Sequence, residues 1–163
     1  MTEQKEFDSI KERAKKKLER DMGAELLAAL YDPKTVEIML NADGKVWQER
    51  QGERARFICK LRVAQAQAII ETIAGFHGKE VTKNNPLLEG EFPLDGSRFA
   101  GQLPPVVRGP TFAIRKKATA IFTLEQYVSA GIMTEAQRLS IIQAVGDHRN
   151  ILVIGGTGSG KTT

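Results

Sequence analysis

Apolar residues recur every three or four positions in two stretches of the N-terminal half. From Phe7 to Leu26 the apolar stripe is opposed by a face rich in lysine and glutamate, which predicts one or two amphipathic helices. Asp32-Pro33 should end this helical region, because proline cannot donate a helical hydrogen bond and disfavours a helical conformation in the preceding residue. The second stretch, Val63 to His77, predicts a helix that ends at Gly78 in a left-handed cap.

Between and after these helices the chain contains short β-prone runs separated by turn residues. Asp95-Gly96 is a strong hairpin signal between two of them. This order predicts a mostly antiparallel sheet with helices on one side, in an α+β domain over residues 1–116 whose residues 1–30 are helical and basic. The expected strands are Val36–Leu40, Lys45–Gln48, Arg54–Cys59, Glu91–Leu94, Arg98–Leu103 and Thr111–Arg115.

A second domain is expected over residues 123–163, after a linker at residues 117–122. Thr123 and Thr134 each begin a capping-box pattern, in which the threonine and a residue three positions later satisfy each other's backbone donors. Two helices should start there. Ile151 to Ile154 is apolar without alternation, as expected of a parallel strand buried on both faces, so these residues predict the start of an α/β domain.

Composition and charge are those of an ordinary soluble protein, with 41% hydrophobic and 27% charged residues. The formal net charge is +4, and the basic residues gather in Lys11–Arg20, Arg50–Arg62 and Arg115–Lys117. Acidic residues are interleaved, which favours a solvated surface. For the first helix we expect packing on its own domain; the alternative is a basic helix on a membrane surface or between subunits.

The sequence shows no clear pattern for a signal peptide, a membrane-spanning segment or a zinc site. Cys59 is the only cysteine and there are two histidines, so no zinc-type cluster is expected and a reducing compartment fits. His77 is interpreted as a helix-end residue without a chemical role. The N-terminal residues are charged, unlike a signal peptide, and no apolar run is long enough to cross a bilayer. We expect a cytosolic protein, peripheral to a membrane at most.

The segment Gly155 to Thr162 carries the clearest chemical signal. It fits the pattern G-x-x-x-x-G-K-[ST] and follows the expected buried strand directly, which is the context of a phosphate-binding P-loop. Its glycines let successive backbone amides converge on phosphate oxygens. Lys161 would bring a positive charge to the β- and γ-phosphates of ATP, and the Thr162 hydroxyl would coordinate Mg²⁺. The expected nucleotide-binding residues are Gly156, Thr157, Gly158, Ser159, Gly160, Lys161, Thr162 and Thr163.

The 163 residues do not include the other parts that such a site requires. The helix that normally follows a P-loop, the flanking parallel strands and an acid that would position metal or water are absent from this sequence. We therefore expect this chain to be inactive by itself as an ATPase, and to hydrolyse ATP only as part of a longer protein.

Several segments resemble the type II/type IV secretion ATPase superfamily, over about Leu26 to Thr163. The P-loop segment Asn150–Thr163 and the helix start Phe122–Tyr127 are shared across that superfamily. Asp95–Phe99, Leu103–Val107 and Gly109–Lys116 are similar to its conjugal-transfer branch. The resemblance implies a hexameric, cytoplasmic ATPase at the inner membrane that powers pilus assembly and DNA–protein export through a type IV secretion channel. It also implies an N-terminal domain, a linker and a RecA-like domain, with the nucleotide bound where the two domains meet.

The resemblance assigns roles to named residues of this chain. Lys161 and Thr162 become the phosphate and metal residues. Arg98 and Arg115 are implied to reach the γ-phosphate from the N-terminal domain, as catalytic residues together with Lys161. An arginine fork matches phosphate oxygens bidentately and stays charged, so the assignment is chemically reasonable. The alternative is that both arginines are ordinary surface residues on exposed strand faces.

The partners implied are further copies of the chain in a hexamer and inner-membrane components of the secretion system. Direct DNA binding is not expected, because basic and aromatic residues do not interleave as in a base-stacking surface. Two alternatives stay open: a type II secretion or pilus-retraction ATPase, and a non-catalytic module that docks subunits, membrane or channel through residues 1–116.

Overall fold

The computed structural model describes residues 2–117 and 123–155. The chain divides into two compact units, Met1–Lys117 (unit 1) and Ala118–Thr163 (unit 2), and each is described by itself. Most of the expected linker, residues 118–122, lies outside the described residues.

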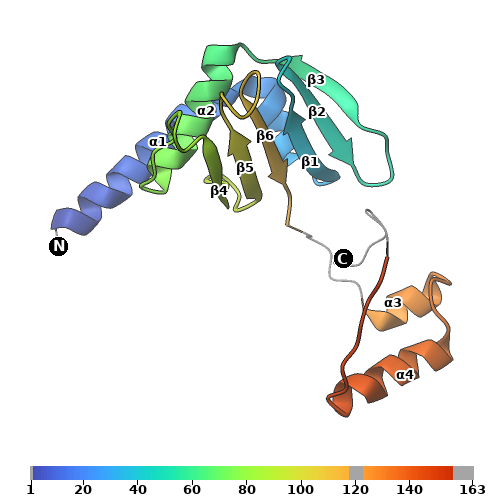
Figure 1. Ribbon diagram of the computed structural model, residues 1–163. Helices are drawn as coiled ribbons and strands as arrows, with labels where there is room; N and C mark the ends of the chain where they lie inside the picture. Colours follow the sequence, from blue (N-terminus) through green and yellow to red (C-terminus); the bar gives the residue numbers. More distant parts are fainter. Residues whose placement is uncertain (1, 118–122, 156–163) are drawn as a thin grey trace. The chain divides into compact units, whose positions relative to one another are not determined.

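Unit 1 is an antiparallel sheet covered on one face by helices (Figure 1). The six strands are ordered β3-β2-β1-β6-β5-β4, and every neighbouring pair is antiparallel. This confirms the α+β fold class predicted from the sequence. The elements are α1 (Thr2–Tyr31), β1 (Thr35–Leu40), β2 (Lys45–Arg50), β3 (Arg56–Lys60), α2 (Val63–Phe76), β4 (Leu87–Glu91), β5 (Arg98–Gln102) and β6 (Thr111–Arg115).

The first helical region consists of two helices joined at a kink. Gly23 has φ 75° and ψ 170°, a conformation outside the helical range that glycine adopts without steric cost. Leu18, Leu26 and Leu30 are fully buried, whereas Ile10 is 54% exposed. The expectation that this region packs on its own domain is therefore confirmed from Leu18 onward and is wrong for Ile10.

The core lies between the helices and one face of the sheet. Strands β5 and β6 alternate buried and more exposed residues, as a strand with one covered face must, and β1 does so from Glu37 onward. Ile38, Phe99 and Ile114 face the core from these three strands, and Ile69, Ile70 and Ile73 face it from α2. The residues between them in each strand therefore emerge on the opposite face of the sheet, which we call the open face.

The strand expected at Glu91–Leu94 is wrong, because β4 ends at Glu91. Phe92 turns into the core and is fully buried, and Pro93 has no N–H to donate to a neighbouring strand. Residues 92–97 instead form a loop in which the Phe92 N–H donates to the Ser97 carbonyl and the Gly96 N–H donates to the Phe92 carbonyl. The hairpin between β4 and β5 is confirmed, with Asp95-Gly96 at its turn.

The burial of Phe92 gives a stability prediction. Its ring centroid lies 6.0 Å from that of Phe99 in the core. Phe92→Ala should lower the free energy of unfolding by about 3–5 kcal/mol, because the lost transfer energy adds to the cost of the cavity. Urea denaturation followed by circular dichroism measures this change. Phe57→Ala is the matched control: Phe57 is 52% exposed and should cost no more than about 1.5 kcal/mol. Equal losses in the two variants would contradict the assigned core.

Unit 2 contains α3 (Leu124–Ser129) and α4 (Glu135–Gly146). Both predicted capping boxes are confirmed: Thr123 accepts from the Gln126 N–H, Thr134 accepts from the Gln137 N–H, and each glutamine side chain accepts from its threonine's N–H. Neither helix contains a buried residue.

The strand expected at Ile151–Ile154 is not formed. These residues have no regular secondary structure, and Leu152 and Ile154 are 82% and 83% exposed. A strand requires a neighbour to receive its backbone hydrogen bonds, and the described part of unit 2 contains no strand. Among the helices of residues 2–117 and 123–155, none combines the length and the hydrophobicity required to cross a bilayer.

Candidate anion-binding site

Arg98 and Arg115 lie directly opposite each other on neighbouring strands. Arg98 opens β5 and Arg115 closes β6, and the antiparallel register pairs the two residues. The next pair in the same register is Phe99 with Ile114, both buried in the core. Because side chains alternate along a strand, this buried pair directs both arginines to the open face, where both are exposed.

The two guanidinium groups have no partner in the part of the chain that the structure describes. Neither arginine side chain forms an ion pair or a hydrogen bond with residues 2–117 or 123–155. Like charges directly opposite in a sheet are destabilising. Two exposed forks held side by side that form no ion pair with a carboxylate of the described residues are therefore an arrangement that a bound anion would stabilise.

Acidic residues flank the arginine pair in the same register. Glu91 of β4 is opposite Arg98, and Glu37 of β1 is opposite Arg115. Glu91 is paired with Lys117, with 3.7 Å between Oε1 and Nζ. The row across four strands is thus acid, arginine, arginine, acid, and the positive charge is concentrated at its centre.

The loop before Arg98 is held by Asp95. Its Oδ1 accepts from the Ser97 N–H at 3.0 Å and its Oδ2 accepts from the Ser97 hydroxyl at 2.8 Å. Ser97 is buried. Gly96 has φ 74°, and a Cβ there would lie 2.8 Å from Glu91 Oε1 and 3.2 Å from Lys117 Nζ, so this turn requires glycine. The conformation of the residue pair immediately before Arg98 is therefore determined locally.

Lys116 connects three parts of unit 1 at the end of β6. Its Nζ donates to Asp95 Oδ2 at 2.5 Å and to the Leu30 carbonyl at 2.8 Å, and its N–H donates to the Val36 carbonyl. A lysine at the C-terminal end of a helix also interacts favourably with the free carbonyls there. Partial burial raises the pKa of the nearby Tyr31 phenol, and the negative charges of Glu19 and Asp95 raise this pKa further. The sequence patterns that indicated a turn at Asp95 did not reveal this contact with Lys116.

Most of the P-loop pattern lies outside the described residues. Of Gly155 to Thr163 the structure describes only Gly155; the expected binding residues Gly156, Thr157, Gly158, Ser159, Gly160, Lys161, Thr162 and Thr163 lie outside the described residues. The structure therefore brings together two of the predicted site residues, Arg98 and Arg115.

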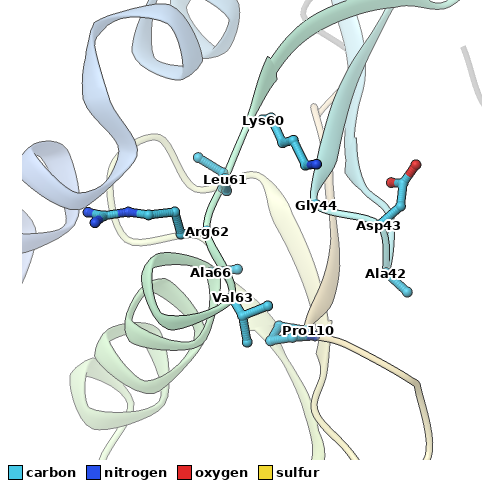
Figure 2. A pocket seen from close by; sticks show the side chains of 9 residues that line it. All are labelled: Ala42, Asp43, Gly44, Lys60, Leu61, Arg62, Val63, Ala66 and Pro110. Atoms are coloured by element: carbon cyan, nitrogen blue, oxygen red, sulfur yellow. The ribbon is translucent and has the colours of Figure 1, made fainter.

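A hollow of about 470 Å³ lies at the other end of β6, where Pro110 precedes the strand (Figure 2). Its lining is mostly apolar, with Leu61, Val63 and Ala66 from the start of α2 and the segment before it. Figure 2 shows Lys60 and Arg62 extending in opposite directions from this segment. The Asp43 carboxylate at its rim pairs with Lys45. Its lining residues do not form an acid–base pair that would indicate catalysis.

The surroundings of His77 and Cys59 indicate structural roles for these two residues. The His77 Nε2 lies 2.6 Å from the Glu91 carbonyl, which connects the end of α2 to β4. Burial raises the pKa of the Cys59 thiol, so it stays protonated near neutral pH and is a weak nucleophile. Within residues 2–117 and 123–155, His, Cys, Asp and Glu side chains do not gather in threes as a metal site requires.

The sequence of this chain is similar to those of conjugal transfer and type IV secretion proteins. No protein-family model matches the chain. It is 44% identical over 148 residues to the probable conjugal transfer protein TrbB of Sinorhizobium fredii, which covers 91% of this chain and 46% of that protein. It is 25% identical over 172 residues to the type IV secretion system protein VirB11 of Bartonella quintana, covering 83% of this chain and 48% of that protein.

Structural comparison finds the VirB11 ATPase of the Brucella suis type IV secretion system, solved in complex with sulphate. The TM-score is 0.64 at 21% sequence identity, over 85% of this chain and 45% of that chain. At this identity the likeness establishes the fold. The chain spans about half the length of the curated relatives it matches.

Proposed function

Because this chain is a homologue of the TrbB conjugal transfer proteins, and more distantly of the VirB11 type IV secretion proteins, we propose that it is part of an ATP-hydrolysing motor of a type IV secretion system. The motor drives conjugative transfer of DNA and protein and the assembly of a pilus. The N-terminal domain of the motor is residues 1–116, the linker is residues 117–122, and a RecA-like ATPase domain begins at residue 123.

The observation that carries this proposal is that two arginines lie side by side and form no ion pair with the described residues. Arg98 and Arg115 are exposed, in register and without a partner among the described residues, and a triphosphate has oxygens in the geometry that two guanidinium forks recognise. We assign both arginines to the γ-phosphate of ATP. There they stabilise the negative charge that develops during phosphoryl transfer.

The P-loop supplies the other proposed phosphate-binding residues. Residues 156–163 hold the phosphates of ATP through their backbone amides, with Lys161 on the β- and γ-phosphates and Thr162 on Mg²⁺. The support for this assignment is the motif itself, Gly155 to Thr162. Mg²⁺ held by the Thr162 hydroxyl would neutralise part of the phosphate charge.

Assembly and location follow from the same homology. The full-length protein works as a homo-hexamer in the cytoplasm, at the inner membrane, where it contacts the membrane components of the secretion system. The relatives' printed description as type IV secretion proteins supports this assignment. Direct DNA binding is not part of the proposal.

The proposal is tested by turnover of a longer protein. Residues 1–163 are joined to the part of the Sinorhizobium fredii relative that this chain does not match, and Mg²⁺-dependent phosphate release from ATP is measured beside that of the 163-residue chain. The longer protein should turn over ATP at about 1–100 per second or below, as other phosphoryl-transfer enzymes do, and the shorter chain should not. A folded longer protein without ATP turnover would contradict the proposal, and equal turnover by the shorter chain would show that residues 1–163 suffice.

A further inference from the structure

Two consecutive lysines after Arg115 each engage a carboxylate that neighbours Arg98. Lys116 Nζ contacts Asp95, which precedes Arg98 in the loop, and Lys117 Nζ lies 3.7 Å from Glu91, which is opposite Arg98 in the sheet. The absence of a partner for Arg98 within the described residues thus coincides with two lysines that occupy those carboxylates.

We propose that Lys116 is a positioning residue that holds the Asp95 carboxylate away from Arg98, and so keeps the arginine pair available to a phosphate group. The inference rests on the proposed function, because it assumes that Arg98 and Arg115 bind phosphate. It assigns Lys116 a role through Asp95, without contact between Lys116 and the nucleotide.

Burial distinguishes Lys116 from Lys117. The side chains of Lys116 and Asp95 are 19% and 13% exposed, whereas those of Lys117 and Glu91 are 62% and 64% exposed. Exposed ion pairs contribute little because water and salt screen them. The partly buried pair is less screened, and its loss leaves an uncompensated charge in a poorly hydrated place.

The contacts around the pair determine the direction in which Asp95 faces. Lys116 follows Arg115 in the chain, so alternation sends its side chain to the face of the sheet opposite that of Arg115. There the Leu30 carbonyl accepts a second hydrogen bond from Lys116, and Ser97 donates two hydrogen bonds to Asp95. Asp95 is thus held on the helix side of the sheet, while Arg98 and Arg115 are exposed on the open face.

Removal of the lysine should release this arrangement. Without Lys116, the Asp95 carboxylate loses its only ion-pair partner among the described residues. It then gains free energy by turning toward Arg98, which is three positions later in the same loop region. An arginine neutralised by its own carboxylate competes poorly for phosphate. Glu37, opposite Arg115, has no such lysine, so the inference concerns the Arg98 half of the pair.

The test is a titration of the 163-residue chain with inorganic pyrophosphate, in which isothermal titration calorimetry measures the affinity. Lys116→Met should weaken pyrophosphate binding about fivefold to tenfold. Asp95→Asn/Lys116→Met should return the affinity to within about twofold of the wild type, because no carboxylate is then left to compete. Lys83→Met is the matched control, because Lys83 is exposed and its side chain has no partner among the described residues, and it should change the affinity by less than about twofold.

The double variant distinguishes a positioning role of Lys116 from two simpler roles, a direct effect of its own charge and a contribution to folding. If the double variant binds as weakly as Lys116→Met, then Lys116 acts through its own charge or through the fold, and the inference is wrong. Wild-type affinity in Lys116→Met also overturns it. If Lys116→Met does not fold, as judged by circular dichroism, the double variant alone decides, since the inference requires it to bind like the wild type.

Failure of the proposed function gives a different pattern. If Arg98→Ala binds pyrophosphate as well as the wild type does, the arginine pair is not a phosphate site, and both the proposed function and this inference fail. If Arg98→Ala loses affinity while Lys116→Met does not, the proposed function stands and the positioning role alone is overturned.

Discussion

Replacing Lys161 with alanine in the longer protein is expected to reduce Mg²⁺-dependent ATP turnover by at least about 100-fold. The ammonium group of Lys161 would be the one fixed positive charge within the P-loop pattern. Its removal leaves the charge on the β- and γ-phosphates without that partner while the transition state forms. Steady-state phosphate release at saturating ATP measures the effect on kcat.

Lys83→Ala is the control for this experiment. Lys83 is an exposed lysine of unit 1, and its side chain has no partner among the described residues. Its removal changes the net charge by the same amount as Lys161→Ala and should leave turnover unchanged. If the Lys161→Ala protein is folded and retains wild-type turnover, the P-loop assignment is wrong.

Arg98→Ala and Arg115→Ala are expected to lower kcat by about 100-fold to 1000-fold each in the same longer protein. Both guanidinium groups would stabilise charge that develops on the γ-phosphate, so the loss should appear in kcat more than in KM. Arg98→Lys should recover only part of the activity, because an ammonium group cannot donate the two parallel hydrogen bonds of a guanidinium fork.

The stability of the two arginine variants gives a second, independent readout. Because the arginines are like charges directly opposite each other, either alanine variant should unfold at the same temperature as the wild type or slightly higher when nucleotide is absent. Arg54→Ala, which removes an exposed arginine from the segment between β2 and β3, is the matched control and should affect neither turnover nor stability. Wild-type turnover in both alanine variants would mean that the arginines are ordinary surface residues.

Patterns with local physical causes predicted the fold well. The capping boxes at Thr123 and Thr134 form as expected, because each is decided by contacts within four residues. The cap at Gly78 also forms, with φ 65°. The mostly antiparallel sheet followed from alternating runs and turn residues, and the positive φ of Gly96 follows from the turn chemistry of Asp95-Gly96.

Predictions that depended on distant partners were less successful. Phe92 looked like a strand residue and is a core residue in a loop, since the helix-covered face accepts its ring. Ile151–Ile154 looked like a buried strand and is exposed, because a strand forms only when another strand receives its hydrogen bonds. Similarly, Ile10 continues the apolar stripe of α1, yet it is 54% exposed, and the first fully buried residue of that stripe is Leu18.

By itself the sequence determined which chemical groups the chain carries: the P-loop pattern, the two arginines in the segments that resemble the conjugal-transfer branch, and the residue types in each element. Only the tertiary structure decided that Arg98 and Arg115 are opposite each other in register, and that Lys116 holds Asp95. The physical reason is separation along the chain. A motif acts over a few neighbouring residues, whereas the pairing of β5 with β6 and the contact of Lys116 with the end of α1 depend on which faces are buried when the whole sheet and its helices pack.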